Sequence, residues 1–184
     1  IGVYVVRRRQ LIELLEACAA EGRSDFVNDI LIRYKNVKKI YGYKLESYWR
    51  NIGTVDSYFK TNMDFLKKDV RDYFFNQYPN IYTKVEDLPP AKYNQTACVK
   101  NSLIASGCII NGDVKDSVLF NKVYVGNNCT IKNSIILNDV YIADNSYIEN
   151  CIVESGSTIK SGTKFVGEGG PKIVVEQNER YQMN

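Results

Sequence analysis

An internal repeat in the second half of the chain limits the possible folds more than any other property of the sequence. Four short segments align, and the Ser or Cys in each stands at position 102, 117, 134 or 151, so the steps are 15, 17 and 17 residues. Within a repeat, apolar residues recur about every six positions, as in Val125, Ile131 and Leu137, with Asn, Asp, Gly and Ser between them. Self-similarity at a short, fixed period is typical of solenoids.

The spacing of the apolar residues predicts a triangular parallel β-helix. Three strands with polar corners make one coil, and each coil adds one strand to each of three sheets, about 4.8 Å above the last. Equivalent apolar residues then stack in columns, such as Val125, Ile142 and Ile159, and each contributes roughly 1.5–3 kcal/mol when fully buried. We expect about four coils, with open ends covered by a neighbouring domain or by another copy of the chain.

The front of the chain predicts a mixed α/β segment. Apolar stripes at helical spacing indicate helices over residues 9–21 and 55–68, and a short helix following Ser24 or Asp25 as its N-cap. Strand-forming residues indicate strands at 1–6, 38–45 and 47–49. This order suits the end of a larger α/β domain. The strand-like opening without a polar lead-in leads us to expect that an upstream part is missing.

Residues 70–93 are predicted to form a connector between two domains. They are rich in Tyr and Phe and end near Pro89 and Pro90, which favour an extended turn at a domain boundary. The aromatic residues suit either packing between domains or a nucleic-acid stacking surface, and we expect packing because no arginine-rich stripe accompanies them. The expected domains are therefore 1–69, the connector 70–93, and a β-helix with a C-terminal tail at 94–184.

The chain contains no histidine, which excludes several reaction classes. The 184 residues carry a net charge of +3, and Ser-His-Asp, Cys-His and His-ligated zinc chemistry all require an imidazole. The five cysteines show no CxxC spacing. They fit buried apolar side chains in a reducing compartment, with a zinc or disulfide framework as the alternative. No run of 18 apolar residues or signal peptide is evident, and we expect a cytoplasmic protein without a membrane or nucleic-acid partner.

Three motifs and their order carry a resemblance to a known family. They are Tyr48-Trp49-Arg50-Asn51-Ile52-Gly53-Thr54, Asn62-Met63-Asp64 and Leu88-Pro89-Pro90-Ala91-Lys92. Followed by the solenoid, they resemble the back part of ADP-glucose pyrophosphorylase, also called glucose-1-phosphate adenylyltransferase. The resemblance implies an α/β nucleotidyltransferase domain joined to a left-handed β-helix. It also implies an Mg²⁺-dependent reaction in which ATP and glucose 1-phosphate give ADP-glucose and pyrophosphate, for glycogen and starch synthesis.

The resemblance places part of the sugar-phosphate site on this chain and the rest upstream. Tyr4, the pair Asp25 and Phe26, and Trp49 match family residues near glucose 1-phosphate. Each also has an ordinary structural interpretation: Tyr4 and Phe26 as core, Asp25 as a helix cap, Trp49 as packing. The family's Gly-rich nucleotide loop has no counterpart in this sequence, so we predict that the chain alone is inactive and binds no cofactor.

Asn51 departs from the family pattern. Active members resemble Tyr-Trp-Arg-Asp-Val-Gly-Thr, whose Asp helps to hold the catalytic Mg²⁺, and an amide lacks the negative charge that this hard cation prefers. We therefore interpret the chain as part of a regulatory-type subunit with weakened catalysis, which assembles with a catalytic subunit. The alternatives are a catalytically active subunit of the same family and a hexapeptide-repeat acyltransferase, which the absence of histidine disfavours.

The resemblance also implies subunit contacts through the β-helix and an effector site near it. We expect a homo-oligomer through the β-helix and a hetero-oligomer with a catalytic adenylyltransferase subunit. Four basic residues near the junction are candidates for binding an anionic effector, with a solvated surface role as the alternative for each: Lys44, Lys92, Lys100 and Lys122.

Overall fold

The structure, a computed structural model, describes residues 2–77, 81–84 and 86–176 and divides into two compact units, Ile1–Ser47 and Tyr48–Asn184. The first unit contains helix α1 (Arg8–Ala20) and the π-helical turn η1 (Phe26–Ile32). Leu14, Cys18 and Ile30 form its small core. Gly22, with φ +70°, ends α1 in a left-handed conformation that glycine adopts without steric cost. Both helices confirm the sequence-based predictions.

The segments predicted as strands at the front of the chain are not strands. Residues 2–6, 38–45 and 47–49 have no strand conformation, and residue 1 lies outside the described part of the chain. A strand requires a hydrogen-bonded neighbour, and none of these segments pairs with another described segment. Val5 is 100% exposed and Tyr43 is 92% exposed, so their apolar side chains remain without the neighbours that a sheet would supply.

The second unit begins with helices α2 (Val55–Asp64), α3 (Lys68–Arg71) and the π-helical turn η2 (Asp72–Gln77). Thr54 caps α2 in a reciprocal capping box: its hydroxyl accepts from the Ser57 N–H at 3.2 Å, and the Ser57 hydroxyl accepts from the Thr54 N–H at 3.0 Å. The predicted helix over 55–68 therefore starts as expected. It ends at Asp64, because a turn at residues 65–67 separates it from α3.

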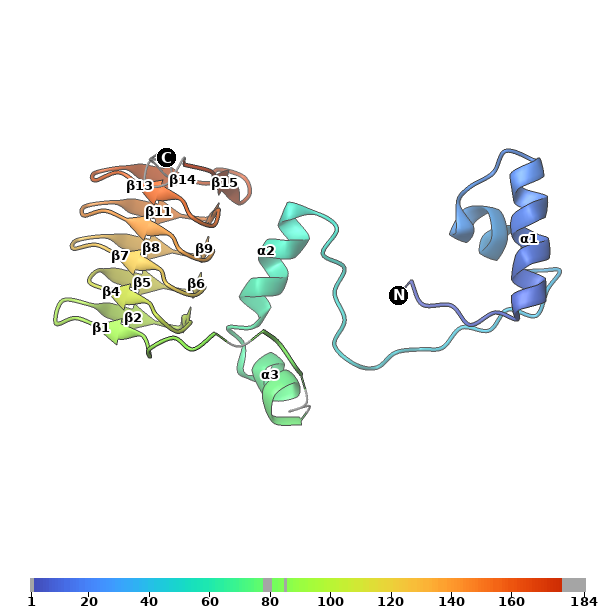
Figure 1. Cartoon of the computed structure of the whole chain (residues 1–184), viewed down its shortest axis with the longest axis horizontal. Helices are drawn as coiled ribbons and strands as arrows, with labels where there is room; N and C mark the ends of the chain where they lie inside the picture. Colours follow the sequence, from blue (N-terminus) through green and yellow to red (C-terminus); the bar gives the residue numbers. More distant parts are fainter. Residues whose placement is uncertain (1, 78–80, 85, 177–184) are drawn as a thin grey trace. The chain divides into compact units, whose positions relative to one another are not determined.

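Fifteen short strands then form a parallel β-solenoid (Figure 1). Three five-stranded sheets make its faces: the first contains β1, β4, β7, β10 and β13, the second β2, β5, β8, β11 and β14, and the third β3, β6, β9, β12 and β15. The strand bounds are β1 Lys92–Tyr93, β2 Cys98–Lys100, β3 Leu103–Ile104, β4 Ile109–Ile110, β5 Asp113–Lys115, β6 Val118–Leu119, β7 Tyr124–Val125, β8 Thr130–Lys132, β9 Ile135–Ile136, β10 Tyr141–Ile142, β11 Tyr147–Glu149, β12 Cys151–Val153, β13 Thr158–Ile159, β14 Lys164–Val166 and β15 Lys172–Val174. This is the architecture expected of the hexapeptide-repeat β-helix.

The register confirms the apolar columns read from the sequence. Val125, Ile142 and Ile159 are consecutive partners in the first sheet and are fully buried. The solenoid has five coils rather than about four. The sequence comparison reached the fifth coil at Ile159 in β13, but it missed the last strand, because Ile152 pairs with Ile173, 21 residues further on and outside the 17-residue period. The first strand, β1, lies in the segment predicted as the connector.

The repeated motif, Asx-Ser in three copies and Asn-Cys in the fourth, forms one corner of each of the first four coils. The Asx residues have positive φ, as at Asn133 (φ +41°), a conformation that Asn and Asp tolerate better than most residues. The next serine is buried and bridges coils: the Ser134 hydroxyl donates to the Lys132 carbonyl at 2.6 Å and accepts from the Cys151 N–H at 3.1 Å. Ser117 makes the equivalent bonds one coil earlier. The motif therefore closes the corner and joins it to the next coil.

Helix α2 packs on the outer face of the third sheet (Figure 1). Phe59 forms a buried cluster with Ile135 and Ile152, which groups α2 with the solenoid in this chain. The predicted domain limits 1–69, 70–93 and 94–184 differ from the division at Ser47 and stay a prediction. No helix among the described residues has the length and apolar character needed to cross a membrane.

Candidate functional site

A buried carboxylate holds the segment that carries the Tyr48–Thr54 motif. The Asp64 side chain, only 11% exposed, accepts hydrogen bonds from the Tyr48 hydroxyl at 3.0 Å, from Arg50 Nε at 3.1 Å and from Lys67 Nζ at 2.6 Å. Two of these donors come from the chain before α2 and one from the turn after it. The last residue of α2 therefore joins three parts of the second unit.

The donors keep this carboxylate charged. Burial raises the pKa of Asp64, but hydrogen bonds from Lys67, Tyr48 and Arg50 outweigh it and hold the pKa below its usual value. Burial and the bond to Asp64 raise the pKa of Tyr48. At neutral pH the centre is therefore an ionised carboxylate that accepts from a neutral phenol and two cations.

Trp49 lies between the two anchored residues. Tyr48 and Arg50 are two positions apart, the separation that brings side chains to one side of an extended chain, so Trp49 is left on the other side. Its side chain is 49% exposed, and within the described part of the chain it has no hydrogen-bonding or ring-stacking partner. The indole is thus available for contact while the residues beside it are fixed.

Asn51 forms a tight turn that leads into α2. Its side-chain oxygen accepts a hydrogen bond from the Gly53 N–H at 3.0 Å, the pattern of an Asx-turn. An aspartate at this position could accept the same bond, so the turn does not require an amide. The turn shows how the backbone is shaped here, and the choice between Asn and Asp decides only the charge.

The described residues do not fit a magnesium site on their own. Mg²⁺ prefers carboxylate oxygens and waters, whereas Asn51 offers a neutral oxygen that already accepts a hydrogen bond. Across residues 2–77, 81–84 and 86–176, no group of three or more His, Cys, Asp or Glu side chains is arranged to hold a metal ion. The expectation of Mg²⁺ rests on the family resemblance.

The other residues of the expected sugar site lie in the first unit. The rings of Tyr4 and Phe26 pack with centroids 4.8 Å apart. Asp25 caps η1 by accepting from the Asn28 N–H at 2.8 Å, a bond that lowers the pKa of Asp25. The structural interpretations of Asp25 and Phe26 are therefore observed, and a role at glucose 1-phosphate for these residues and for Trp49, in the second unit, stays a prediction.

The four candidate effector lysines come from both units of the chain. Lys44 belongs to the first unit and lies 3.9 Å from Glu46. Lys92 is on the first sheet and Lys100 on the second. Lys122 stands at a corner of the solenoid and forms ion pairs with Glu86 at 3.4 Å and Asp139 at 3.9 Å. An anion site formed by these lysines stays a prediction.

The aromatic residues of the connector pack on one another. The Phe74 ring contacts Tyr48, Phe65 and Tyr73 with centroids 5.0–5.4 Å apart. These contacts lie within the second unit, and packing of the connector between domains stays a prediction. Tyr82 is exposed, and Tyr78, a further aromatic residue of the predicted connector, lies outside the described residues. Because Tyr48 is part of this cluster, the connector also supports the Asp64 centre.

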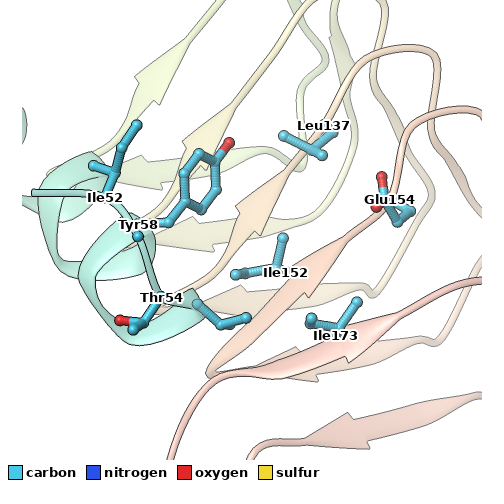
Figure 2. Close-up of a pocket in the computed structure, with 9 residues that line it drawn as sticks. Ile52, Thr54, Tyr58, Leu137, Ile152, Glu154 and Ile173 are labelled. Carbon is cyan, nitrogen blue, oxygen red and sulfur yellow. The ribbon is translucent and has the colours of Figure 1, made fainter. Parts of the chain in front are cut away.

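A shallow apolar groove of about 320 Å³ adjoins the same motif. Figure 2 shows Ile52 and Tyr58 on one side and Ile152 and Ile173, from the third sheet, on the other. Glu154 is its one charged lining residue. Sequence reasoning missed this groove, although a signal existed: strands of the third sheet carry consecutive apolar residues, such as Ile135–Ile136, which indicates burial on both faces.

Comparisons with known proteins support the hexapeptide solenoid and the family resemblance. A family model described as "GlmU-like, C-terminal hexapeptide" matches residues 89–172. Curated relatives named glucose-1-phosphate adenylyltransferase match 71% of the chain: 37% identity in Thermosipho melanesiensis, 35% in Desulfitobacterium hafniense and 38% in Clostridium botulinum, covering 32%, 34% and 35% of those proteins. The chain spans about a third of the length of the curated relatives it matches.

Proposed function

From the similarity of this chain to the C-terminal part of glucose-1-phosphate adenylyltransferases, we propose that it works as the C-terminal part of a subunit of such an enzyme. The reaction would join ATP and glucose 1-phosphate to give ADP-glucose and pyrophosphate in glycogen biosynthesis. One observation carries the proposal beyond sequence similarity: Asp64 fixes the Tyr48–Thr54 motif so that Trp49 is exposed between two anchored neighbours. This arrangement suits a residue that contacts a ligand.

The chain's own residues would bind and orient the sugar phosphate rather than carry out chemistry. Phosphoryl-type transfer depends mainly on positioning and charge neutralisation, which suits a chain without histidine. In the proposal Tyr4, Asp25, Phe26 and Trp49 form part of the wall around glucose 1-phosphate. The nucleotide loop and the carboxylates that hold Mg²⁺ would come from elsewhere in the subunit, because this sequence has no such loop.

We further propose a regulatory-type subunit with weakened catalysis. Asn51 keeps the turn into α2 through its bond to the Gly53 N–H but supplies no negative charge where active members have an aspartate. A neutral ligand weakens the attraction for Mg²⁺. The subunit would then contribute assembly and modulation, with most turnover supplied by a catalytic partner.

In this proposal the solenoid makes the contacts between subunits, both with copies of itself and with the catalytic subunit. Its support is the edge strands: among the described residues, the strands of the first coil (β1, β2, β3) and of the last (β13, β15, β14) stand at the edges of their sheets. We also propose a cytoplasmic protein without a nucleic-acid or membrane partner. Its five cysteines are free, as expected in a reducing compartment.

Restoring a negative charge at residue 51 tests the proposal of a regulatory-type subunit. In the full-length subunit, Asn51→Asp is expected to raise Mg²⁺-dependent ADP-glucose formation by about tenfold, equivalent to about 1.4 kcal/mol of transition-state stabilisation. Asn36→Asp adds the same charge at an exposed position of the first unit and should leave the rate unchanged. Equal rates for wild type and Asn51→Asp would refute this explanation of Asn51. High turnover by the unmodified subunit alone would favour the catalytically active alternative.

A further inference from the structure

Trp49 is the single tryptophan of the chain, and both residues beside it are bonded to Asp64. Tyr48 and Arg50 bind the same oxygen of Asp64, Oδ2, at 3.0 and 3.1 Å. Lys67 binds the other oxygen, Oδ1, at 2.6 Å. The carboxylate thus divides its two oxygens between the segment that carries Trp49 and the turn that follows α2.

The residues that carry the bonds to Asp64 are themselves held by packing. Asp64 is the last residue of α2, and α2 is fixed to the third sheet of the solenoid through Phe59, which packs against Ile135 and Ile152. The Tyr48 ring is held as well: it meets the Phe74 ring edge-on at 5.4 Å and carries the Arg50 guanidinium 5.5 Å from its centroid. The polar bonds to Asp64 therefore connect the backbone around Trp49 to a well-packed part of the molecule.

We propose that Asp64 is a positioning residue, which acts through Tyr48 and Arg50 to hold Trp49 where it contacts glucose 1-phosphate. The second half of this statement rests on the proposed function, whereas the first does not. Preorganisation of this kind lowers the entropy lost when a ligand binds. An asparagine at position 64 would lose the charge that orders three donors, and a glutamate would displace the oxygens by one methylene group.

The fluorescence of Trp49 in the 184-residue chain tests the first half of the proposal, which is that Asp64 holds Trp49 in place through Tyr48 and Arg50. Asp64→Asn should raise the rate of acrylamide quenching of its fluorescence about 1.5- to 2-fold, because local release of the segment can at most double the exposure of the indole. Far-ultraviolet circular dichroism should keep the signal of the solenoid. Asp56→Asn makes the same chemical change at the other end of α2 and should leave quenching unchanged.

Tyr48→Phe removes one hydroxyl and keeps the ring that packs on Phe74, so it tests the anchor even if Asp64→Asn fails to fold. It should give a smaller change in the same direction. Unchanged quenching in either folded variant would overturn the positioning role, whatever the enzyme does.

The second half is tested in the full-length subunit by binding of glucose 1-phosphate and, separately, of ATP. Asp64→Asn should raise the Kd of glucose 1-phosphate about tenfold and leave the Kd of ATP within about twofold, since a general loss of structure would weaken both. If quenching changes but the Kd of glucose 1-phosphate does not, Trp49 is not at the sugar site and that part of the proposed function fails, while the anchor stands. A matching loss for both ligands would also contradict the positioning role.

Discussion

Asp64, Asn51 and the buried serines are single side chains that determine the local course of the backbone. Asp64 gathers three donors, Asn51 closes the turn before α2, and Ser134 connects its own corner to the next coil. Each was visible in the sequence as a motif member or a repeat position. The bonds of Asp64 to Tyr48 and Arg50, and of Ser134 to Cys151, span 14 to 17 residues and depend on the fold, so sequence alone did not identify these partners. The bond of Asn51 to Gly53 is local and spans two residues.

Replacement of a bridging serine should weaken the solenoid. Ser134→Ala leaves the Cys151 N–H without its side-chain acceptor inside a buried corner, so we expect a loss of about 1–3 kcal/mol in the free energy of unfolding. Urea denaturation measures this loss. Ser155→Ala, at an exposed position, is the matched control. Equal stability of Ser134→Ala and wild type would show that the serine column does not stabilise the coils.

The Asp64 centre should give a defined pH dependence. The folded pKa of Asp64 lies below its unfolded value of about 3.9, so its contribution is complete above that value and is lost as pH falls through the folded pKa. Lys67, whose pKa is raised by the bond to Asp64, loses its contribution only at alkaline pH. The stability difference between wild type and Asp64→Asn should therefore be constant from about pH 5 to 8 and shrink below about pH 4. A difference that grows on acidification would contradict this assignment.

At the scale of elements, the period of the solenoid was predictable because inward-facing residues repeat at a fixed interval. The last strand of the fifth coil was missed, since the spacing from Ile152 to its partner Ile173 departs from that interval. The strands expected at the front of the chain fail for a different reason: strand propensity is expressed only beside a hydrogen-bonded neighbour, and no described segment pairs with them. The packing of α2 on the third sheet could have been anticipated, because strands of that sheet carry consecutive apolar residues, such as Ile135 and Ile136, whose side chains face both sides of the sheet.

Helix α2 should depend on one aromatic anchor. Phe59→Ala removes the buried ring between α2 and the outer face of the third sheet, and we expect a cost of roughly 3 kcal/mol for docking of the helix. Amide hydrogen exchange in α2 should then accelerate strongly, while the inner strands of the solenoid keep their protection. Lys60→Ala, at an exposed position of the same helix, should change neither. Unaltered exchange in α2 after Phe59→Ala would show that other contacts hold the helix.

At the scale of the whole molecule, the chain consists of a small helical unit and a much larger solenoid unit. The solenoid fold follows from the repeat and is supported by the family model over residues 89–172. The expected sugar site involves residues of both units, and the part of the chain that matches the curated relatives covers about a third of their length. That is why the repeat could be predicted in detail, whereas the substrate contacts remain predictions.

The solenoid should associate with copies of itself. Its sheets end in edge strands at both ends, and such edges favour pairing with a further chain. Light scattering at high concentration should therefore give a mass at least twice the 21.0 kDa of one chain. A single-chain mass under these conditions would contradict assembly through the solenoid.

The rate of ADP-glucose formation tests the central claim most directly. It should be measured from ATP, glucose 1-phosphate and Mg²⁺ with a catalytic adenylyltransferase subunit, with and without the full-length subunit that contains this chain. The proposed function predicts that the added subunit forms a complex with the catalytic one and changes its rate, while the 184-residue chain alone releases no pyrophosphate. An unchanged rate with no complex formed, or pyrophosphate release by the 184-residue chain alone, would contradict it.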